Sequence, residues 1–406
     1  MALGHSPSIV TNGLVFAYDM NNTGRSWTGA PTTNLVPNPY ADWNGSNFVL
    51  SYNYDGSGGA AYNYVTNVPN PIGSPGVMQY TVGNTGYKYW AIASTIATTG
   101  THTFSYYARI VSGTTATSNL NNVQLWRSNG VDQSVTGNWN PTLTTDWVRY
   151  STTGPCTAGT TLDYFPIHSS SLTGGYTIQY CGFQLELGTY ATPFVAGTRS
   201  TSQSLLDLMS TTTLTTNNLT YNSDNTFNFA GGDATSTVTV PLSTAFNKPT
   251  GTIGMWVNPT SYSGSNGLFV NRDSNTANAA DWFWIGSWDS ANYFFFRLGD
   301  GTTCCNNDLV ISPWAPLCPT NTWTYVTCSW LSGGESRIYT NGVLQASRTI
   351  SAIPATNPSS TGRIGLGHES PGSWNGKIGN TQIYNRQLTV AEILQNFNAI
   401  RGRYGV

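Results

Sequence analysis

The sequence predicts an all-β protein with one short helix near its C-terminal end. Only 8% of the 406 residues are charged, while glycine (43) and proline (20) are plentiful. Such a composition provides polar turns and short strands and little material for helices. Residues 323–330 alternate on a two-residue period, as a strand with two different faces requires. The length exceeds that of one ordinary domain, so we expect two β-sandwiches.

A β-hairpin follows this strand. Residues 337–340 and 343–346 flank Asn341-Gly342, a dipeptide that tolerates the positive φ values of a type I′ turn. We therefore expect two antiparallel strands joined by a two-residue loop.

The closing helix has a clear start signal. Thr389 and Glu392 fit a capping box, and Leu388 and Ile393 have the spacing of a hydrophobic staple. Apolar residues then follow the helical period: Val390, Ile393, Leu394 and Phe397.

This order of elements resembles the laminin-G-like (concanavalin A-like) jelly-roll family. The resemblance rests on WTYVTCSW (323–330), RIYTNGVLQAS (337–347), RIGLG (363–367) and the closing GKIGNTQIYNRQLTVAEILQNFN (376–398). GTIGMWVNPTSY (251–262) is similar to an early strand of that family. The resemblance implies an antiparallel jelly-roll β-sandwich, a fold that hosts lectins, glycosidases, adhesion modules and virion parts alike.

The N-terminal segment that is typical of this family's domains is interrupted in this sequence. GLVFAYD (13–19) is similar to its first strand, but the usual continuation begins only at Ser204. Long insertions in exposed loops are tolerated because closure entropy grows slowly with loop length. We therefore expect a discontinuous domain of residues 1–34 and 200–406, with residues 35–199 inserted as a second domain.

The expected insert has strand patterns of its own, including alternation over residues 100–110. Its tail, QLELGTYATPFVAGTRS, resembles the end of carbohydrate-binding-module-like jelly rolls in phage tail and fibre proteins. That resemblance implies a second β-sandwich. The matching positions are Gln184, Leu185, Glu186, Gly188, Ala191, Thr192, Pro193 and Phe194.

Charge and the chain's start bear on location. A formal net charge of −2 without a basic run gives no electrostatic case for nucleic acid or an anionic membrane. The first residues lack a basic and an apolar signal region, and no long apolar run occurs. We expect no membrane insertion, and synthesis in a host cytoplasm without a signal peptide. An extracellular type of fold without such a signal points to a virus particle released by lysis.

The cysteines have no CxxC spacing and are sparse for a disulfide scaffold. We expect buried free thiols, because the expected synthesis in the cytosol favours the reduced form. The sequence leaves open a Cys156–Cys181 bridge and pairing of Cys304 and Cys305 with Cys318 and Cys328.

Enzymatic chemistry has little support. A glycoside hydrolase needs two carboxylates across one bond, and the closely spaced acids of the related glucanases are missing from this sequence. Glu369 beside His368 is the one loop glutamate with a candidate partner; Glu186, Glu335 and Glu392 belong to structural motifs. We expect no enzyme.

Metal and cofactor signals are equally sparse. The histidines are dispersed, and the cysteine spacing is wrong for zinc. Asn271, Asp273 and Asp281 are candidate calcium ligands, with a polar turn without an ion as the alternative. We expect no other cofactor.

Glycan binding fits the composition best, because sugars bind aromatic faces and neutral hydrogen-bonding groups. On residues 282–285, one face carries two indoles and the other carries Phe283 and Ile285. Each tryptophan has sandwich core as its alternative, and we expect Trp374 to be exposed. The candidates are Trp282, Trp284, Trp288, Trp314, Trp374, Asn271, Arg272, Asp273 and His368, and in the insert Trp43, Tyr52, Tyr54, Tyr62, Tyr64 and Trp90.

Taken together, these patterns predict a non-enzymatic bacteriophage virion protein. We expect it on the tail, fibre or capsid, with adhesion to glycans or the host surface. Other virion proteins, host glycans and further copies of the chain, with a trimer as the candidate oligomer, are the expected partners. The alternatives are a purely structural decoration or scaffold subunit and, with least support, a glycoside hydrolase.

Overall fold

The structure is a computed structural model that divides the chain into two compact units. Unit 1 comprises Met1–Ala30 and Thr201–Val406, and unit 2 comprises Pro31–Ser200. The boundaries expected from the sequence were 34/35 and 199/200. The structure describes residues 8–22, 25–40, 50–54, 61–82, 86–113, 126–128, 131–133, 136–137, 143–172, 176–222, 226–231, 235–241, 249–262, 266–271, 283–288, 293–302, 306–355, 360–366 and 372–406.

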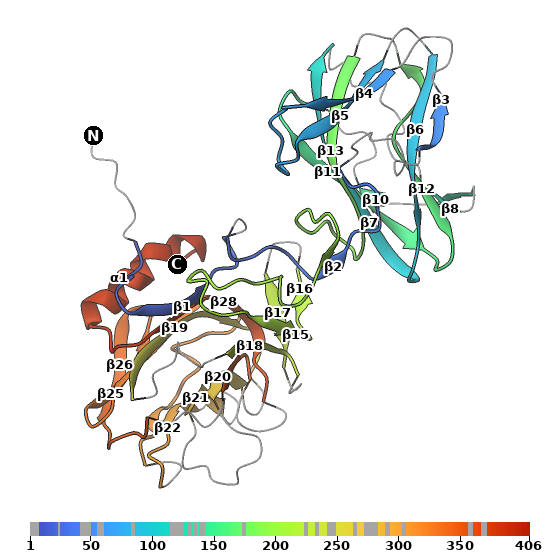
Figure 1. Ribbon diagram of the computed structural model, residues 1–406. Coiled ribbons are helices and arrows are strands. Elements are labelled where there is room, and N and C mark those ends of the chain that lie inside the picture. Colours follow the sequence, from blue (N-terminus) through green and yellow to red (C-terminus); the bar gives the residue numbers. More distant parts are fainter. Residues whose placement is uncertain are drawn as a thin grey trace, which may run out of the picture. The chain divides into compact units, whose positions relative to one another are not determined.

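Two antiparallel sheets form unit 1 (Figure 1). The eight-stranded sheet has the order β16 (Thr220–Tyr221), β17 (Phe227–Ala230), β28 (Asn375–Tyr384), β19 (Thr250–Pro259), β24 (Thr324–Leu331), β25 (Glu335–Thr340) and β26 (Val343–Thr349), and β1 (Leu14–Tyr18) also pairs with β28. The seven-stranded sheet has the order β15 (Thr215–Asn217), β18 (Thr237–Pro241), β27 (Thr361–Ile364), β20 (Asn266–Asn271), β21 (Phe283–Trp288), β22 (Tyr293–Leu298) and β23 (Leu309–Ile311).

The main core of unit 1 lies between these two sheets. Ile253, Met255 and Val326 contribute from the eight-stranded sheet, and Phe283 and Phe296 contribute from the seven-stranded sheet. All five side chains are at most 2% exposed. Alternate residues of each strand point inward, as the two-residue period demands. The prediction of an all-β sandwich fold with one short helix is confirmed.

Strand β24 is buried on both faces. Val326, Cys328 and Trp330 face the main core, whereas Tyr325 belongs to a second cluster with Trp256. Helix α1 (Val390–Ile400) covers this second face, and the ribbon shows it against the eight-stranded sheet (Figure 1). The cluster is completed by ring contacts from Phe397 of α1 and from Tyr404, which follows the short 3₁₀ helix Arg401–Arg403 and stacks on Trp256 at 4.3 Å between centroids.

The hairpin and the helix cap agree with the sequence signals. Asn341 and Gly342 have φ values of 50° and 80°, as a type I′ turn requires. Thr389 and Glu392 form both hydrogen bonds of the capping box.

The apolar residues at helical spacing in α1 divide between its two sides. Ile393 and Phe397 are buried, but Val390 and Leu394 are exposed. The reason lies in Asn396, which takes a buried position by donating to the Tyr384 hydroxyl and accepting from the Val10 amide. This contact turns the helix so that its inward side is formed by Ile393, Asn396, Phe397 and Ile400.

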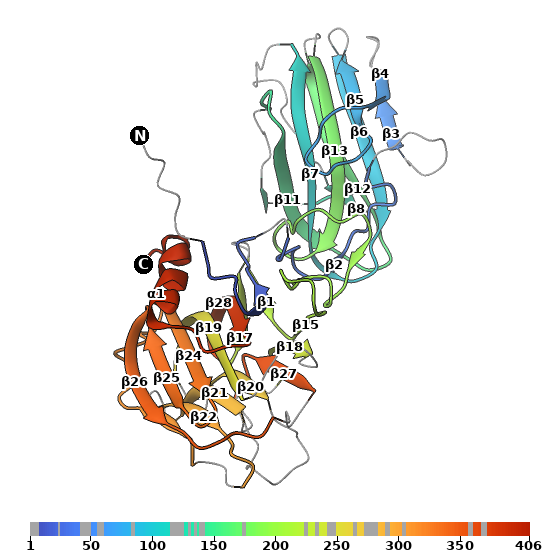
Figure 2. The ribbon, with the colours of Figure 1, turned by 60° about the vertical axis from the view of Figure 1, so that its left-hand side comes forward.

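Unit 2 is also built of two antiparallel sheets. The six-stranded sheet has the order β10 (Thr136–Gly137), β11 (Val148–Cys156), β7 (Gly100–Ser112), β13 (Tyr176–Leu187), β5 (Gly76–Val82) and β4 (Ala61–Thr66). The five-stranded sheet has the order β3 (Leu50–Tyr54), β6 (Gly86–Thr95), β12 (Thr161–Leu172), β8 (Trp126–Ser128) and β9 (Val131–Gln133). Figure 2 shows the strands of unit 2 from a second direction.

The first and last segments of unit 2 are bonded to each other. Strand β2 (Thr32–Thr33) pairs with β14 (Thr198–Arg199). Asn34 then donates to the carbonyls of Phe183 and Val195 and accepts from the amides of Val36 and Leu185. One side chain thus satisfies four backbone groups where the chain enters and leaves the unit.

The tail motif of unit 2 forms a buried polar network. The Glu186 carboxylate, which is fully buried, accepts from the side chain of Gln184 at 2.6 Å and from both the amide and the hydroxyl of Thr192. Arg199 donates to the Pro193 carbonyl at 2.7 Å. These bonds hold residues 190–199 against β13, so the motif has a structural role in this chain.

The described cysteines are free and buried: Cys156, Cys181, Cys318 and Cys328. The expectation of buried thiols is confirmed for these four, and the bridge considered between Cys156 and Cys181 is not formed. Cys304 and Cys305 lie outside the described residues. Burial raises the pKa of Cys156 and of Cys181 to about 12, and that of Cys318 to about 11.

Deleting residues 31–200 and joining Ala30 to Thr201 should leave unit 1 folded. The two ends already meet, since the Thr28 amide donates to the Ser204 carbonyl at 3.0 Å and Trp27 forms a β-bridge with Leu205. We expect a β-rich circular dichroism spectrum and one cooperative thermal transition. A longer deletion of residues 26–205 removes Trp27 and the bonds of Ser26, and should not fold. Failure of both deletions would contradict the prediction.

Stability should fall as the pH rises above about 8.5, the ordinary pKa of a thiol. The unfolded chain releases its thiol protons there, whereas burial raises the pKa of Cys181 to about 12, so the folded chain keeps its proton. The contribution of Cys181 to the free energy of unfolding is complete below the thiol pKa of the unfolded chain and is lost as the pH approaches 12, the pKa in the folded chain. Urea unfolding at pH 7, 9 and 10.5 measures this slope, and Cys181→Ser should flatten it. Equal slopes in both proteins would contradict this origin.

Candidate functional site

The expected aromatic platform of unit 1 is largely core. Trp284 and Trp314 are fully buried, and Trp374 is 1% exposed. Trp314 stacks on Phe294 at 4.0 Å between ring centroids and belongs to the main core. None of these indoles is an exposed sugar-binding face. The alternative of sandwich core holds for Trp314 and Trp374, whereas Trp284 belongs to a separate buried cluster.

The expectation that Trp374 is exposed is wrong. Its amide donates to the Gly365 carbonyl, and the preceding Ser373 bridges to Gly267 and Leu366, so this segment is tied to the sheet. The indole therefore points into the main core, where its Nε1 donates to the Lys377 carbonyl at 3.2 Å. A turn sequence rich in Ser, Pro and Gly did not place its tryptophan at the surface.

Asn271 is also removed from the binding set. Its side chain is fully buried, and its Nδ2 donates to the Thr361 carbonyl at 3.2 Å. The amide links β20 to β27. A sugar hydroxyl has no access to it in this structure.

The remaining candidates of unit 1 lie outside the described residues: Trp282, Arg272, His368, Asp273, Asp281 and the side chain of Trp288. The same holds in unit 2 for Trp43 and for the side chains of Tyr52, Tyr54, Tyr62 and Trp90, while Tyr64 is half-buried. Within the described part of the chain, no group of three His, Cys, Asp or Glu side chains is placed to hold a metal ion. The calcium assignment stays a prediction.

The outer face of the seven-stranded sheet carries an aromatic group that includes one predicted residue. Phe283 and Ile285 of β21 face the main core, which settles the two sides of that strand, and Trp284 points to the other side. There its indole stacks on Phe295 of β22, with 5.8 Å between centroids and 19° between planes. The ring of Tyr293 lies 6.1 Å from that of Phe295.

Glycine makes this stacking feasible. Phe295 lies directly opposite Gly286 in the β21–β22 register. A Cβ at Gly286 would lie 2.8 Å from the indole Nε1 of Trp284 and 2.6 Å from the Asn266 carbonyl oxygen. The missing side chain lets the indole lie along the strand beneath Phe295.

An ion pair borders these rings. Arg297 lies opposite Trp284 and places its guanidinium 5.7 Å from the Trp284 ring and 5.9 Å from the Phe295 ring. Its Nε and Nη2 donate to the Asp308 carboxylate at 2.7 to 3.1 Å. Burial raises the pKa of the Asp308 carboxyl, and the bonds from Arg297 oppose that rise. The fork is held rigidly by bonding and stacking together.

Two members of the group reach solvent. Tyr293 is 41% exposed, and Val310, which is opposite Phe295 on β23, is 40% exposed. Phe295 is half-buried and Trp284 is fully buried beneath it. We call Tyr293, Phe295, Trp284, Arg297 and Val310 the aromatic surface. It offers apolar ring faces next to charged hydrogen-bonding groups.

Sequence reasoning missed Tyr293, Phe295 and Arg297 as site residues. The signal was present in the alternation of residues 293–298, where three residues face the core and the other three face outward. What the sequence lacked was the register that brings this strand beside β21.

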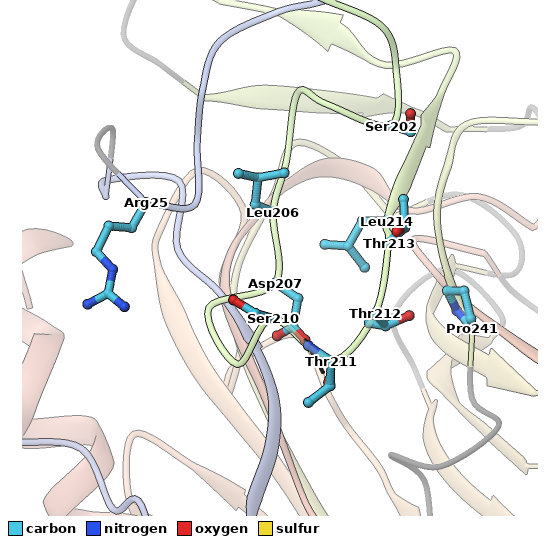
Figure 3. Close-up of a pocket in the computed structure, with 10 residues that line it drawn as sticks. All are labelled: Arg25, Ser202, Leu206, Asp207, Ser210, Thr211, Thr212, Thr213, Leu214 and Pro241. Carbon is cyan, nitrogen blue, oxygen red and sulfur yellow. Dashed lines mark hydrogen bonds between the residues drawn. The ribbon is translucent and has the colours of Figure 1, made fainter. Parts of the chain in front are cut away.

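A polar pocket of about 580 Å³ lies elsewhere in unit 1. Figure 3 shows its hydroxyl side chains along one segment, with Arg25 on a separate one. Asp207 lines this pocket, but its carboxylate accepts from the amides of Ala17, Met209 and Thr211 and from the Thr211 hydroxyl. With its acceptor oxygens engaged in these bonds, Asp207 holds the turn and is not arranged as a general base.

The described glutamates are likewise engaged. Glu335 accepts from Arg337 at 2.6 Å, and Glu392 accepts from Arg386 at 2.6 Å in addition to its capping bonds. These bonds lower the pKa of Glu392 to about 2. Glu186 lies within the buried network of unit 2. Glu369, the loop acid considered for catalysis, lies outside the described residues.

Comparison with protein families gives a match over residues 229–394, which fit a laminin-G profile described as the concanavalin A-like lectin/glucanases superfamily. These residues of unit 1 are similar to a concanavalin A-like domain. The matched range runs from within β17 to within α1, so it includes the aromatic surface.

Solved structures that are similar to part of the chain include a botulinum neurotoxin type G receptor binding domain, with 17% identity, a TM-score of 0.36 and coverage of 48% of each chain. Another is a botulinum neurotoxin serotype D ligand binding domain in complex with N-acetylneuraminic acid, with 14% identity, a TM-score of 0.38 and coverage of 49% of each chain. The chain thus spans about half the length of these structures. No curated protein matches the chain.

Within the described residues, no helix combines the length and the apolar character that a membrane crossing needs.

Trp374→Ala should destabilise the protein and leave the aromatic surface intact. Truncating a buried tryptophan costs about 3–5 kcal/mol, since it removes apolar contacts and leaves a cavity. Urea unfolding measures the loss. Tyr293→Ala, at an exposed ring, is the matched control and should change the free energy of unfolding by less than about 1 kcal/mol. Equal losses in the two variants would contradict the assignment of Trp374 to the core.

Proposed function

We propose that this chain is a glycan-binding protein and that the aromatic surface of unit 1 is its binding site. The observation that supports it is the aromatic group formed by Tyr293, Phe295 and Trp284 beside the Arg297–Asp308 pair. Apolar faces of sugar rings pack on aromatic side chains, while hydroxyl groups bond to neighbouring polar groups.

Each part of the surface has a distinct role in this proposal. Tyr293 and Phe295 present the exposed and half-exposed rings on which a sugar packs. Trp284 lies beneath Phe295 and holds its orientation. Arg297 is fixed by Asp308, so its bound position costs little further side-chain entropy. Val310 extends the apolar area across β23.

We further propose that the protein is non-enzymatic. Glu186 is engaged in a buried network, Glu335 in an ion pair with Arg337, and Glu392 in an ion pair with Arg386 and in the helix cap, so none of the described glutamates is arranged as a free acid or base. Glycoside hydrolysis would require a pair of carboxylates across one bond. Polysaccharide cleavage measured for the wild type and for Glu369→Gln tests this: equal, background release of reducing ends is the expected result, and release above background only in the wild type would contradict it.

The biological setting that we propose is a bacteriophage virion, with the protein on the tail, fibre or capsid and the glycan on the host surface. Support comes from the low fraction of charged residues, the high content of Ser, Thr and Asn, and the resemblance of residues 184–200 to the ends of jelly rolls in phage tail and fibre proteins. Other virion proteins and further copies of the chain, as a trimer, are the proposed partners. Mass spectrometry of purified virions tests the setting, and absence of the protein from particles would overturn it.

Tyr293→Ala should weaken glycan binding about tenfold, which corresponds to roughly 1.4 kcal/mol. A glycan array identifies the sugar, and titration calorimetry measures the affinity. Val343→Ala is the matched control, because Val343 is 60% exposed and lies on β26 of the other sheet. It should bind as the wild type does.

The opposite result also has a clear meaning. If no array sugar binds at millimolar concentration, the purely structural role of a decoration or scaffold subunit replaces the adhesion role. If binding is present but equal in Tyr293→Ala and the wild type, the aromatic surface is not the site.

A further inference from the structure

We propose that the outer face of the six-stranded sheet of unit 2 is a separate binding surface for saccharides that carry an anionic group, a carboxylate or a sulfate. Its centre is Arg109, with Gln179, Gln79, Trp147 and Arg149 around it. The surface belongs to unit 2 and uses none of the residues of the aromatic surface. It differs in ligand class as well, because the aromatic surface is proposed for sugar rings irrespective of charge.

The surface is built as a row across neighbouring strands. In the sheet register Gln79 of β5 is opposite Gln179 of β13, and Gln179 is opposite Arg109 of β7. Their chain neighbours Tyr80, Ile178, Tyr180, Ala108 and Ile110 all belong to the core of unit 2. The row therefore lies on the face turned away from that core, and Figure 2 shows these strands side by side.

Hydrogen bonds connect the members of this row. Arg109 donates from Nε to the Gln179 Oε1 at 2.9 Å, and Gln179 donates from Nε2 to the Gln79 Oε1 at 2.9 Å. The amide of Gln179 is thereby oriented, with its oxygen toward the cation. Gln179 is 4% exposed, whereas Gln79 and Arg109 are only half-buried. The chain of bonds is anchored at its buried centre and open at its ends.

The guanidinium of Arg109 is held in one orientation but keeps its recognition groups. Its carbon lies 4.9 Å from the centroid of the Trp147 ring, and Trp147 is fixed by donating from Nε1 to the Pro69 carbonyl at 3.0 Å. Stacking and the Nε bond fix the plane of the fork. Among the described residues, neither Nη atom of Arg109 has a hydrogen-bond acceptor. These two groups are the ones that bind a carboxylate or sulfate bidentately.

A second cation lies on the adjacent strand. Arg149 of β11 is opposite Tyr107, with its guanidinium 5.5 Å from that ring, and donates from Nη2 to Ser105. Its Nε is buried without a partner among the described residues. Burial lowers the pKa of Arg149, and the charges of Tyr107 and Glu186 oppose this. A bound anion would add negative charge beside the two guanidinium groups.

An acidic saccharide fits this combination better than a neutral one. An arginine fork on an aromatic ring favours a planar or tetrahedral anion, the ring of Trp147 offers an apolar face, and the Gln79 amide offers hydrogen bonds to hydroxyl groups. A nucleic acid would need a longer series of cations than two, and the chain has no basic run. The ligand is therefore argued to be a sugar with an anionic substituent.

The test is titration calorimetry of the full chain with three defined probes. They are an oligogalacturonate, which carries carboxylates, a sulfated galactan oligosaccharide, and an uncharged galactan oligosaccharide. We expect at least one acidic probe to bind and Arg109→Gln to weaken it at least tenfold, with the neutral probe unaffected by that change. The better acidic probe distinguishes carboxylate from sulfate. Arg25→Gln is the matched control, because Arg25 is an exposed arginine of unit 1 and the charge change is the same.

Two further variants keep the test decisive. Arg109→Lys retains the charge but not the fork, and is expected to bind as weakly as Arg109→Gln; wild-type affinity in a folded Arg109→Lys would overturn the proposal. So would unchanged affinity in a folded Arg109→Gln, or an equal loss in Arg25→Gln. Tyr293→Ala should keep its affinity for the acidic probe, so failure at one surface is distinguishable from failure at the other. Thermal melts establish that each variant is folded.

Discussion

The antiparallel pairing of β1 with β28 is the constraint on which unit 1 depends. It joins residues 14–18 to residues 381–384, with Leu14 opposite Tyr384 and Tyr18 opposite Thr381. The sandwich therefore closes only when the first and last parts of the chain meet, and β28 also pairs with β17 and β19. A long insertion is compatible with this closure because its ends are bonded to each other, through β2 and β14 and through Asn34.

Burial of polar groups explains why several motifs are structural here. In a chain with few charges, side-chain amides and hydroxyls must satisfy the buried backbone. Asn34 satisfies four backbone groups, Asp207 holds the turn of residues 207–211, and Glu186 closes the tail of unit 2. The tail motif of unit 2 thus holds a loop against a sheet. Gln184, Glu186 and Thr192 of this motif bond to one another in a buried network.

The aromatic residues divide according to sheet face. Trp314 and Trp374 fill the space between the sheets of unit 1, where large side chains are needed to reach close packing. Tyr293 and Phe295 lie on the opposite face, where Arg297 and Asp308 join them. Composition cannot tell these two roles apart, because both call for aromatic side chains. Only the solvent exposure of a ring in the folded structure distinguishes a ring that could contact a sugar from a ring that fills the core.

Local sequence determined the strand at 323–330, the Asn341-Gly342 turn and the Thr389 cap, because propensity, turn geometry and capping act over a few residues. It also determined the all-β class, since so few charges and so many turn residues leave little for helices. Tertiary structure alone decided the burial of Trp374, the exposure of Leu394 and the meeting of Trp284 with Phe295. These depend on register and on contacts between distant strands, which no short stretch of sequence contains.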